Sequence, residues 1–250
     1  DKPDYGNWVP QKISFFLFFA SIVSYLVTFL LNIRLIVGLL KIASLLFLGF
    51  FIYLEYVYWL LEKDDKGMQR QFWTILIEQL NWDGNGKALD IGTGSGPIAI
   101  LLARKYPSAL VKGIDYWGEP WTYSRQNCER NAKIEGVSSR VSFERASAVD
   151  LPFSDGEFDA VLSNFVFHAI KFQDRTQLIA EALRVLRDGG AFAFQDLFND
   201  EFYSEDFLDI VEGWGLREVN FVDSSDYIHI PIALRPKHMT GGSGILFGIK

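Results

Sequence analysis

Apolar residues are concentrated in the first quarter of the chain, in two long runs. The run 13–31 spans 19 residues and contains no charged side chain. This is close to the ~20 residues that an α-helix needs to cross a bilayer. Asn32, Ile33 and Arg34 separate it from a second run, 35–61, which is broken only by Lys41 and Glu55. Because so short a turn joins the two runs, we expect a helical hairpin whose ends lie on one side of a membrane.

The charges that flank the hairpin predict its orientation. Basic side chains at the two ends are Lys2, Lys12, Lys63, Lys66 and Arg70, while the turn carries Arg34 and, near it, Lys41. Cytoplasmic flanks of membrane helices carry an excess of Lys and Arg. We therefore expect a membrane hairpin over residues 1–66, with helices at about 13–31 and 35–61. Both ends, and the domain that follows over 67–250, should face the cytoplasm.

Three other interpretations of the apolar runs stay open at the level of sequence. The first run could be a signal peptide, although it lacks a small-residue cleavage site and is longer than a usual apolar core of such a peptide. The second could lie in the membrane interface as an amphipathic helix, given Lys41 and Glu55. Both could also pack as helices inside a soluble protein.

From residue 67 onward the hydrophobic pattern alternates between strands and helices, which is typical of an open, mostly parallel sheet. Short apolar runs predict strands at 87–91, 110–115, 141–145, 158–164, 191–195, 218–222 and 244–249. Amphipathic segments predict helices at 69–80, 97–105, 121–135, 175–187 and 207–215. The sequence Asp188-Gly189-Gly190 is expected to end the fourth of these helices. These elements together predict an α/β domain with helices on both faces of its sheet.

The charge and the cysteine content of the chain exclude some classes of function and some kinds of cross-link. The chain has 24 basic and 31 acidic residues, a net charge of −7. Residues 1–66 hold six of each sign, so the whole excess lies in 67–250. An acidic domain without a basic stripe is a poor candidate for binding nucleic acid. The single cysteine, Cys128, rules out an internal disulfide, and we interpret it as a structural helix residue.

The segment after the first predicted strand has the composition of a ligand-binding turn. Gly92, Gly94 and Gly96 are spaced G-x-G-x-G, and Pro97 stands near the place where a dinucleotide fingerprint needs its third glycine. Proline suits the first turn of a helix, because its missing N–H would have no partner there. Acidic residues, Asp90 and Asp115, lie at the ends of two predicted strands. The spacing disfavours a nicotinamide oxidoreductase.

Four motifs in order resemble those of one family, the class I S-adenosylmethionine-dependent methyltransferases of the small-molecule, type-11 branch. They are D-I-G-T-G-S-G at 90–96, G-I-D-Y-W at 113–117, A-V-D-L-P-F-S-D-G-E-F-D-A-V at 148–161 and R-V-L-R-D-G-G-A-F-A-F at 184–194. The resemblance covers about 86–196 and implies a Rossmann-like, seven-stranded sheet with a final antiparallel strand. The hairpin lies outside it, and resembles extensions of some membrane-anchored bacterial members.

The resemblance also implies roles for individual residues in binding S-adenosyl-L-methionine. Asp90 would hold the methionine amino group, Asp115 both ribose hydroxyls, and Tyr116 would flank the adenine. Many relatives place an acid that binds the adenine amine where this chain has Ser147, followed by Ala148. A serine hydroxyl or a backbone carbonyl could replace it. The full predicted cofactor set is Asp90, Gly92, Thr93, Gly94, Gly96, Asp115, Tyr116, Ser147, Ala148 and Asn164.

Methyl transfer to a good nucleophile needs alignment more than acid–base help, so a missing catalytic constellation is not evidence against it. His168, just after the fourth predicted strand, is the candidate base if the acceptor must lose a proton. The three histidines, His168, His229 and His238, lack metal-ligand spacing, and we predict no metal.

The aromatic residues near the predicted site suit an apolar or amphiphilic acceptor, although core packing explains most of them equally well. They are Trp117, Trp121, Tyr123, Phe165, Phe167 and Phe172. The leading hypothesis is an enzyme that methylates a small or lipid-like acceptor at the cytoplasmic membrane face. The alternatives are methylation of a soluble small molecule, with the hairpin only as anchor, and a non-catalytic S-adenosylmethionine-binding module.

Overall fold

The computed structural model describes residues 2–62, 67–118, 122–171, 173–199, 203–204, 206–236 and 240–250. The chain divides into two compact units: one comprises the residues up to Gly6 together with Gln71–Lys250, and the other is Asn7–Arg70. Five residues named above lie outside the described residues: Lys63, Lys66, Trp121, Phe172 and His238.

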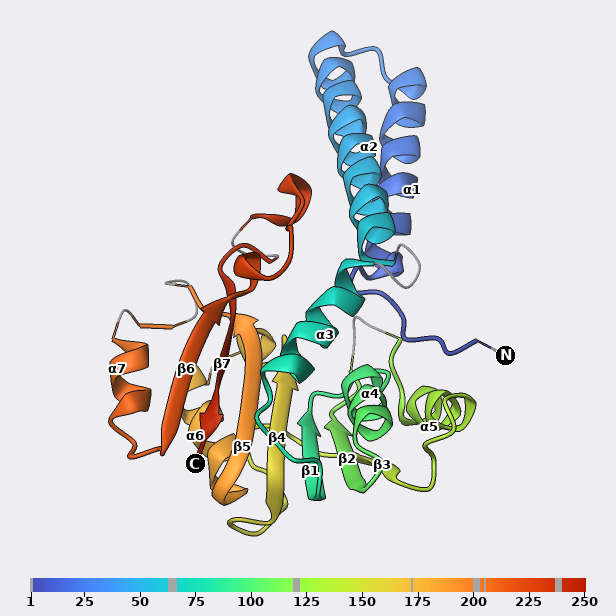
Figure 1. Ribbon diagram of the computed structural model, residues 1–250. Coiled ribbons are helices and arrows are strands. Elements are labelled where there is room, and N and C mark those ends of the chain that lie inside the picture. Colours follow the sequence, from blue (N-terminus) through green and yellow to red (C-terminus); the bar gives the residue numbers. More distant parts are fainter. Residues whose placement is uncertain are drawn as a thin grey trace. The chain divides into compact units, whose positions relative to one another are not determined.

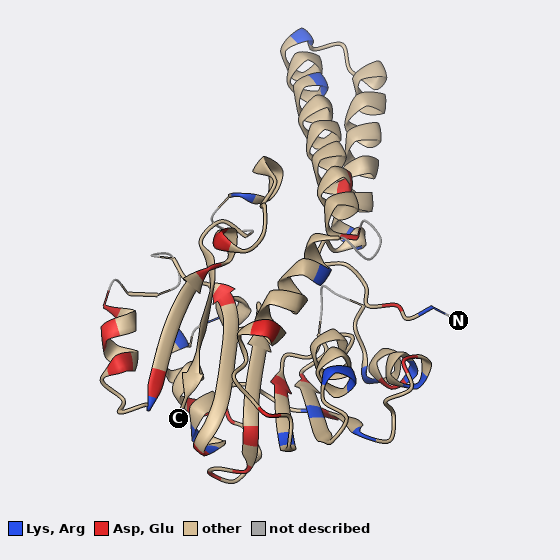
Figure 2. Cartoon of the chain, viewed as in Figure 1, with Lys and Arg blue, Asp and Glu red and all other residues tan. Residues whose placement is uncertain are grey.

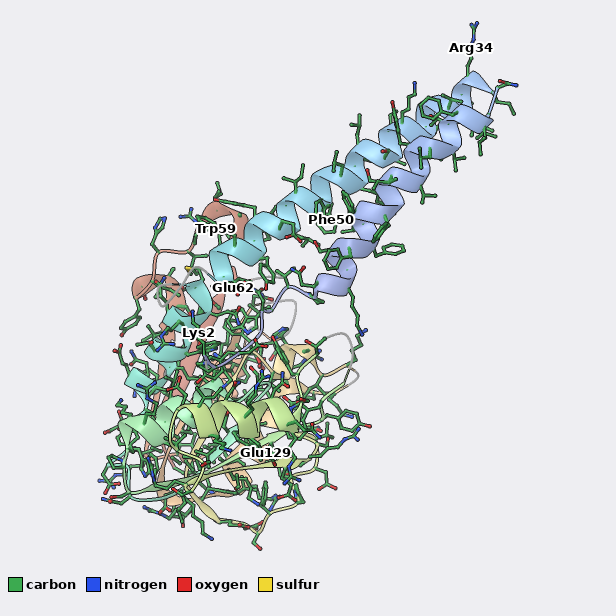
Figure 3. All side chains as sticks on the ribbon, turned by 90° about the vertical axis from the view of Figure 1, so that its right-hand side faces the viewer. Lys2, Arg34, Phe50, Trp59, Glu62 and Glu129 are labelled. Carbon is green, nitrogen blue, oxygen red and sulfur yellow. The ribbon has the colours of Figure 1, made fainter. Side chains whose placement is uncertain are left out.

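The unit Asn7–Arg70 is a helical hairpin. It consists of α1 (Gln11–Val27), the 3₁₀ turn η1 (Thr28–Leu30) and α2 (Arg34–Glu62), close to the predicted bounds. By length and composition alone, Gln11–Leu30 and Arg34–Glu62 are each apolar enough to cross a membrane. Figure 2 shows few charges along these helices, and Figure 3 marks Arg34 at the turn end and Glu62 at the opposite end.

Small polar side chains join the two hairpin helices. The Ser21 hydroxyl donates to the Ser44 carbonyl oxygen at 3.0 Å, and the Ser44 hydroxyl donates to the Ser21 carbonyl oxygen at 2.9 Å. Nearer the open end of the hairpin, the Ser14 hydroxyl donates to the Glu55 carboxylate. Such contacts let helices approach closely and satisfy polar groups within an apolar surface. The outward faces consist of large apolar side chains, and Phe29, Leu30 and Leu35 are more than 70% exposed.

The larger unit is built on a seven-stranded sheet of order β3-β2-β1-β4-β5-β7-β6. Its strands are β1 (Gly86–Ile91), β2 (Ala109–Asp115), β3 (Val141–Arg145), β4 (Phe158–Asn164), β5 (Leu186–Leu197), β6 (Glu218–Asp223) and β7 (Ser243–Ile249). β7 runs antiparallel to both β5 and β6, and the other pairs are parallel. The predicted Rossmann-like fold with a final antiparallel strand is therefore confirmed.

Helices cover both faces of this sheet (Figure 1). They are α3 (Met68–Gln79), α4 (Pro97–Lys105), α5 (Arg125–Ile134), α6 (Arg175–Arg184) and α7 (Phe207–Glu212). The central strands β1 and β4 are buried over most of their length, because a parallel sheet with two covered faces exposes neither side. A core cluster around Phe158, Phe192 and Phe194 joins the sheet to α6 and α7.

The boundary between α6 and β5 differs from the prediction. The helix ends at Arg184, three residues early, and β5 already begins at Leu186. The amide of Phe158 donates to the Val185 carbonyl oxygen at 3.0 Å, so the chain joins the sheet at once. The prediction that 185–187 are helical is thus wrong. Gly189 lies within the strand at a φ of +71° rather than in a turn between elements.

Candidate cofactor site

The turn that follows β1 is held in place by the neighbouring strand. The amides of Gly92 and Thr93 both donate to the carbonyl oxygen of Ile114, each at 2.8 Å. Gly92 has a φ of +73°, and a Cβ placed on it would lie 2.1 Å from Cγ2 of Val166. Only glycine fits this position without strain or collision. The bare backbone of the turn therefore lies directly over the carboxyl ends of the central strands.

The first turn of α4 begins where the glycine turn ends. Gly96, in the left-handed region at a φ of +89°, is the N-cap residue, and Pro97 occupies the first helical position, as the sequence predicts. The N-terminal amides of a helix favour negatively charged or oxygen-rich groups. In this structure one of them already has such a partner, since the amide of Ala99 donates to Asp90 Oδ2 at 3.1 Å.

Asp90 is a buried carboxyl at the end of β1. Its side chain accepts a hydrogen bond from the Thr93 hydroxyl at 2.6 Å in addition to the one from Ala99. The pKa of Asp90 is raised to about 7: burial is the largest cause, the two hydrogen bonds oppose it, and the negative charge of Asp115 adds to the rise. A buried carboxyl of this kind gains most from a cationic ligand, because such a ligand stabilises its ionised form.

Asp115 ends β2 beside the glycine turn. Its Oδ2 accepts from the amide of Gly94 at 2.8 Å, and its Oδ1 accepts from the amide of Trp117 at 2.7 Å. The indole Nε1 of Trp117 donates back to the Gly94 carbonyl oxygen at 2.8 Å. Trp117 has a φ of +48°, unusual for a bulky residue, and this closed loop of hydrogen bonds holds it there. The remaining lone pairs of the carboxylate can accept from hydroxyl groups.

The next predicted site residues lie on the β2 and β3 side of the turn. Tyr116 is 65% exposed, and the guanidinium of Arg145 lies 4.6 Å from the centre of its ring. The Ser147 hydroxyl accepts from the amide of Val149 at 3.2 Å, which occupies it within its own turn. Ala148 packs against the core cluster. Of this group, only Tyr116 presents a large exposed surface.

On the other side of the turn, the ends of β4 and β5 carry a second set of polar groups. The side-chain amide of Asn164 donates to Gln195 Oε1 at 2.7 Å, which fixes it against the neighbouring strand. His168 lies in the short 3₁₀ helix η3 (Phe167–Ala169), with Nδ1 at 2.5 Å from Asp196 Oδ1. Sequence reasoning missed Asp196. It directly follows the predicted strand 191–195, so the rule that singled out Asp90 and Asp115 could have found it.

Cys128 lies under the glycine turn. Its thiol is fully buried and donates to the Gly94 carbonyl oxygen at 3.2 Å. Burial, and then the charges of Asp115 and Asp90, raise the pKa of this thiol well above its usual range. It is therefore a protonated structural group, as we inferred from the sequence.

The segment 2–6, near the start of the chain, also reaches this turn. The amide of Asp4 donates to Asn131 Oδ1 at 2.9 Å, and Asn131 Nδ2 donates to the carbonyl oxygens of Asp4 and Ser95 at 2.7 and 3.0 Å. The Ser95 hydroxyl donates to the Tyr5 carbonyl oxygen. Residues 2–6 thus form a strap over the start of α4 and over α5. No periodic pattern marks so short a segment in the sequence.

Comparisons with known proteins agree with this geometry. A family model described as a methyltransferase domain matches residues 89–194. The ubiquinone/menaquinone biosynthesis C-methyltransferase UbiE of Geotalea daltonii is 30% identical over 125 residues, which are 50% of this chain and 51% of that protein. A malonyl-[acyl-carrier protein] O-methyltransferase of Geobacter sulfurreducens is 38% identical over 120 residues, 48% of this chain and 41% of that protein. The matched region thus spans about half the length of these relatives.

A solved structure shows the same fold. The geranyl diphosphate C-methyltransferase of Streptomyces coelicolor, determined with Mg²⁺, geranyl diphosphate and S-adenosyl-L-homocysteine, aligns with a TM-score of 0.55 at 14% sequence identity. The alignment covers 73% of this chain and 79% of that one. At this identity the likeness extends to the arrangement of strands and helices.

Proposed function

The domain around residues 89–194 belongs to the class I S-adenosylmethionine-dependent methyltransferases, and on that premise we propose that this chain methylates a small, lipid-like acceptor at the cytoplasmic face of a membrane. The proposed binding of S-adenosylmethionine is supported mainly by the pair of carboxyl groups beside the glycine turn. One, Asp90, is buried beneath the turn, and the other, Asp115, is fixed at its rim by backbone amides.

These residues fit S-adenosyl-L-methionine group by group. Asp90 would hold its amino group, and the backbone from Gly92 to Gly96, with Thr93, would lie along it. Asp115 would accept from the ribose hydroxyls, and Tyr116 would cover the adenine. Ser147 and Ala148 would bound the adenine end, and Asn164 would face the cofactor from β4. When bound, the cofactor supplies a methyl group that its sulfonium has already activated for transfer.

A small acceptor is supported by the names of the relatives, which act in quinone biosynthesis and on malonyl-[acyl-carrier protein]. A lipid-like acceptor at a membrane is supported by the hairpin. Large apolar side chains cover its outside, and charges are scarce between its two ends (Figure 2). Such a surface is stable in lipid and costly in water. An anchor of this kind raises the local concentration of a membrane-dissolved acceptor.

Calorimetry tests the cofactor assignment. The full chain in detergent micelles should bind S-adenosylmethionine, and NAD should bind far more weakly. Asp115→Ala should abolish binding of S-adenosylmethionine, whereas Asp155→Ala, which changes an exposed carboxylate, should leave it unchanged. Tighter binding of NAD, or unchanged affinity in Asp115→Ala, would contradict the assignment.

Incubation of the chain with methyl-labelled S-adenosylmethionine and a membrane extract tests the acceptor. Label in the lipid fraction supports the proposal. Label only in water-soluble products supports a soluble acceptor, for which the hairpin serves as anchor alone. Binding of the donor without any transfer of label supports a non-catalytic binding module.

A further inference from the structure

The connection between β6 and β7 presents the most exposed large apolar side chain among the described residues. Ile232 is 82% exposed, slightly more than Leu30 on the outside of the hairpin. Because β7 runs antiparallel to both of its neighbours, β6 is parallel to β5, and its carboxyl end lies at the same edge of the sheet as the glycine turn. The connection therefore extends from the edge that carries the candidate cofactor site (Figure 1).

Ile232 is held outward by an ordered turn. It begins the 3₁₀ helix η5 (Ile232–Leu234), directly after Pro231. The amide of Leu234 donates to the Pro231 carbonyl oxygen at 2.8 Å. Ile230 and Leu234, on either side of Ile232, are buried. A single exposed isoleucine is common on protein surfaces, so its surroundings decide what can cover it.

The chemistry of the segment 227–236 suits a lipid surface. The segment contains no acidic residue, although the domain around it holds the chain's excess of acidic side chains. Tyr227, at its start, is half exposed. Arg235 follows Ile232 by one 3₁₀ turn, and its Nε donates to the Ile230 carbonyl oxygen at 3.0 Å, which holds the guanidinium close to the turn. An apolar tip flanked by an aromatic and a basic side chain matches the boundary between acyl chains and headgroups.

Both chain segments that lead into the hairpin start at this same edge of the sheet. The strap lies on the glycine turn, where the Tyr5 carbonyl oxygen accepts from the Ser95 hydroxyl. The helix α3 begins near the carboxyl end of β4, where Phe72 and Phe165 meet edge to face with ring centroids 5.2 Å apart. Four residues, 7–10, separate the strap from α1. A membrane that holds the hairpin is therefore tethered to the carboxyl edge of the sheet rather than to the opposite edge.

We propose that the segment 227–236 is a second membrane contact, in which Ile232 inserts into the lipid surface and Arg235 meets anionic headgroups. The inference rests on the proposed membrane location of the chain, and adds to it the edge that the domain turns towards the bilayer. An acidic domain is repelled by anionic headgroups, and this acid-free segment is where the repulsion is weakest. An apolar acceptor can then pass from the membrane to the candidate cofactor site without crossing bulk water.

Spin labelling in vesicles measures where Ile232 lies. On the Cys128→Ala background, a nitroxide is attached to Ile232→Cys, to Leu46→Cys on the outside of α2, or to Leu110→Cys, an exposed position at the amino end of β2. The full chain is held in vesicles of phosphatidylcholine and phosphatidylglycerol. Oxygen concentrates in lipid and a nickel chelate stays in water, so each relaxes labels in its own medium. We expect oxygen to dominate at positions 232 and 46, and the nickel chelate at position 110.

The other outcomes are distinguishable from one another. If the nickel chelate relaxes the labels at positions 232 and 110 alike, while the label at position 46 stays in lipid, the second contact is overturned and the anchored hairpin remains. Protection at position 232 from both reagents indicates a protein partner, such as a second copy of the chain, and also overturns the lipid contact. Exposure of the label at position 46 to the nickel chelate contradicts the proposed membrane location itself.

Substitution without a label tests whether this contact serves the acceptor. With methyl-labelled S-adenosylmethionine and a membrane extract, Ile232→Ser should lower transfer into the lipid fraction several-fold, because the edge of the sheet is held less closely to lipid. Binding of S-adenosylmethionine should be unchanged. Leu110→Ser, which makes the same kind of change at the opposite edge of the sheet, should alter neither.

Unchanged transfer by Ile232→Ser would overturn the role of the contact in acceptor access. Weaker binding of S-adenosylmethionine in this variant would mean that Ile232 serves the fold, and would overturn it too. If the unchanged chain transfers no label at all, the proposed methyl transfer is contradicted, and the spin labels alone then decide the contact.

Discussion

At the scale of single residues, Asp90 shows how burial opposes charge in this site. Burial raises its pKa to about 7, from an ordinary value of 3.8. Between these two values the folded chain keeps a proton on Asp90 that the unfolded chain has already lost. The stability that this site contributes is therefore complete below about pH 4, falls as the pH rises to about 7, and is constant above that.

Asp90→Asn should remove this dependence, since the amide does not titrate. The free energy of unfolding of the variant, taken relative to that of the unchanged chain, should rise by roughly 2 to 3 kcal/mol as the pH is raised from 5 to 7. Urea unfolding of both chains in detergent, without S-adenosylmethionine and followed by tryptophan fluorescence, measures the difference. Parallel stability curves would show that Asp90 is ionised in the folded chain throughout this range.

Gly92 allows a second prediction at this scale. Gly92→Ala should both strain the backbone and collide with Val166, whereas Gly136→Ala has a similar φ, +71°, and open space around it. The left-handed conformation costs an alanine roughly 1–2 kcal/mol, and overpacking adds about 1–3 kcal/mol more. Gly92→Ala should thus destabilise the chain more than Gly136→Ala in urea unfolding. It should also weaken S-adenosylmethionine binding, measured by calorimetry, while Gly136→Ala should not.

The double variant Gly92→Ala, Val166→Ala separates the two costs. It should recover part of the lost binding affinity, because it removes the collision and keeps the backbone strain. Equal destabilisation by Gly92→Ala and Gly136→Ala would mean that Val166 moves aside freely.

The same residues show what could be predicted from sequence. The backbone conformation of the glycine turn was predictable, because glycines and proline mark local backbone geometry at strand ends. The hydrogen bond from Asn164 to Gln195 and the contact of His168 with Asp196 were not, since each joins residues about 30 positions apart. Their pairing depends on the register of β4 and β5. A one-residue slip in either strand would turn the side chains to the other face of the sheet.

At the scale of elements, β5 and the hairpin were predictable to different degrees. The start of β5 was missed because Gly189 and Gly190 are typical turn residues. They are held in the sheet by the chain end, where the Gly189 amide donates to the Lys250 carbonyl oxygen at 2.8 Å, and the Lys250 amide donates to Gly190 at 3.0 Å. Hairpin bounds were nearly right, because length and hydrophobicity alone determine them.

Site-directed labelling tests whether the hairpin spans a membrane. Cys128 is buried, and Cys128→Ala gives a background without thiols. On that background, a thiol from Ile33→Cys lies at the turn, and one from Asp188→Cys lies on an exposed part of β5. In intact bacterial cells whose outer membrane has been permeabilised, an impermeant maleimide should label the first variant at once. It should label the second only after the inner membrane is disrupted.

Other outcomes favour the other interpretations of the apolar runs. Two thiols that are accessible from the same side indicate helices that lie in the interface or pack outside the bilayer. A mature chain shortened by about the length of the first run indicates a signal peptide that has been removed.

At the scale of the whole molecule, the distribution of charge decides how the chain could associate with a membrane. The net charge of −7 lies entirely in residues 67–250. Figure 2 shows acidic and basic residues spread over the strands and helices of the larger unit, while the hairpin carries few of either. An acidic surface is repelled by anionic lipids. Attachment by electrostatic attraction is therefore unfavourable, and the proposed attachment depends on the apolar hairpin.

This predicts attachment that salt does not reverse. Membranes from cells that express the full chain should retain it in the pellet in 1 M NaCl, where the attraction between charges more than ~3 Å apart is largely screened. They should also retain it after washing at alkaline pH. Detergent should release it, because detergent replaces the lipid around Phe29, Leu30 and Leu35. A peripheral chain held by charges would be released by salt, and one held only by other proteins would be released by the alkaline wash. Release by either treatment would contradict a membrane-spanning hairpin, and with it the proposal that the methyl acceptor is met at the membrane.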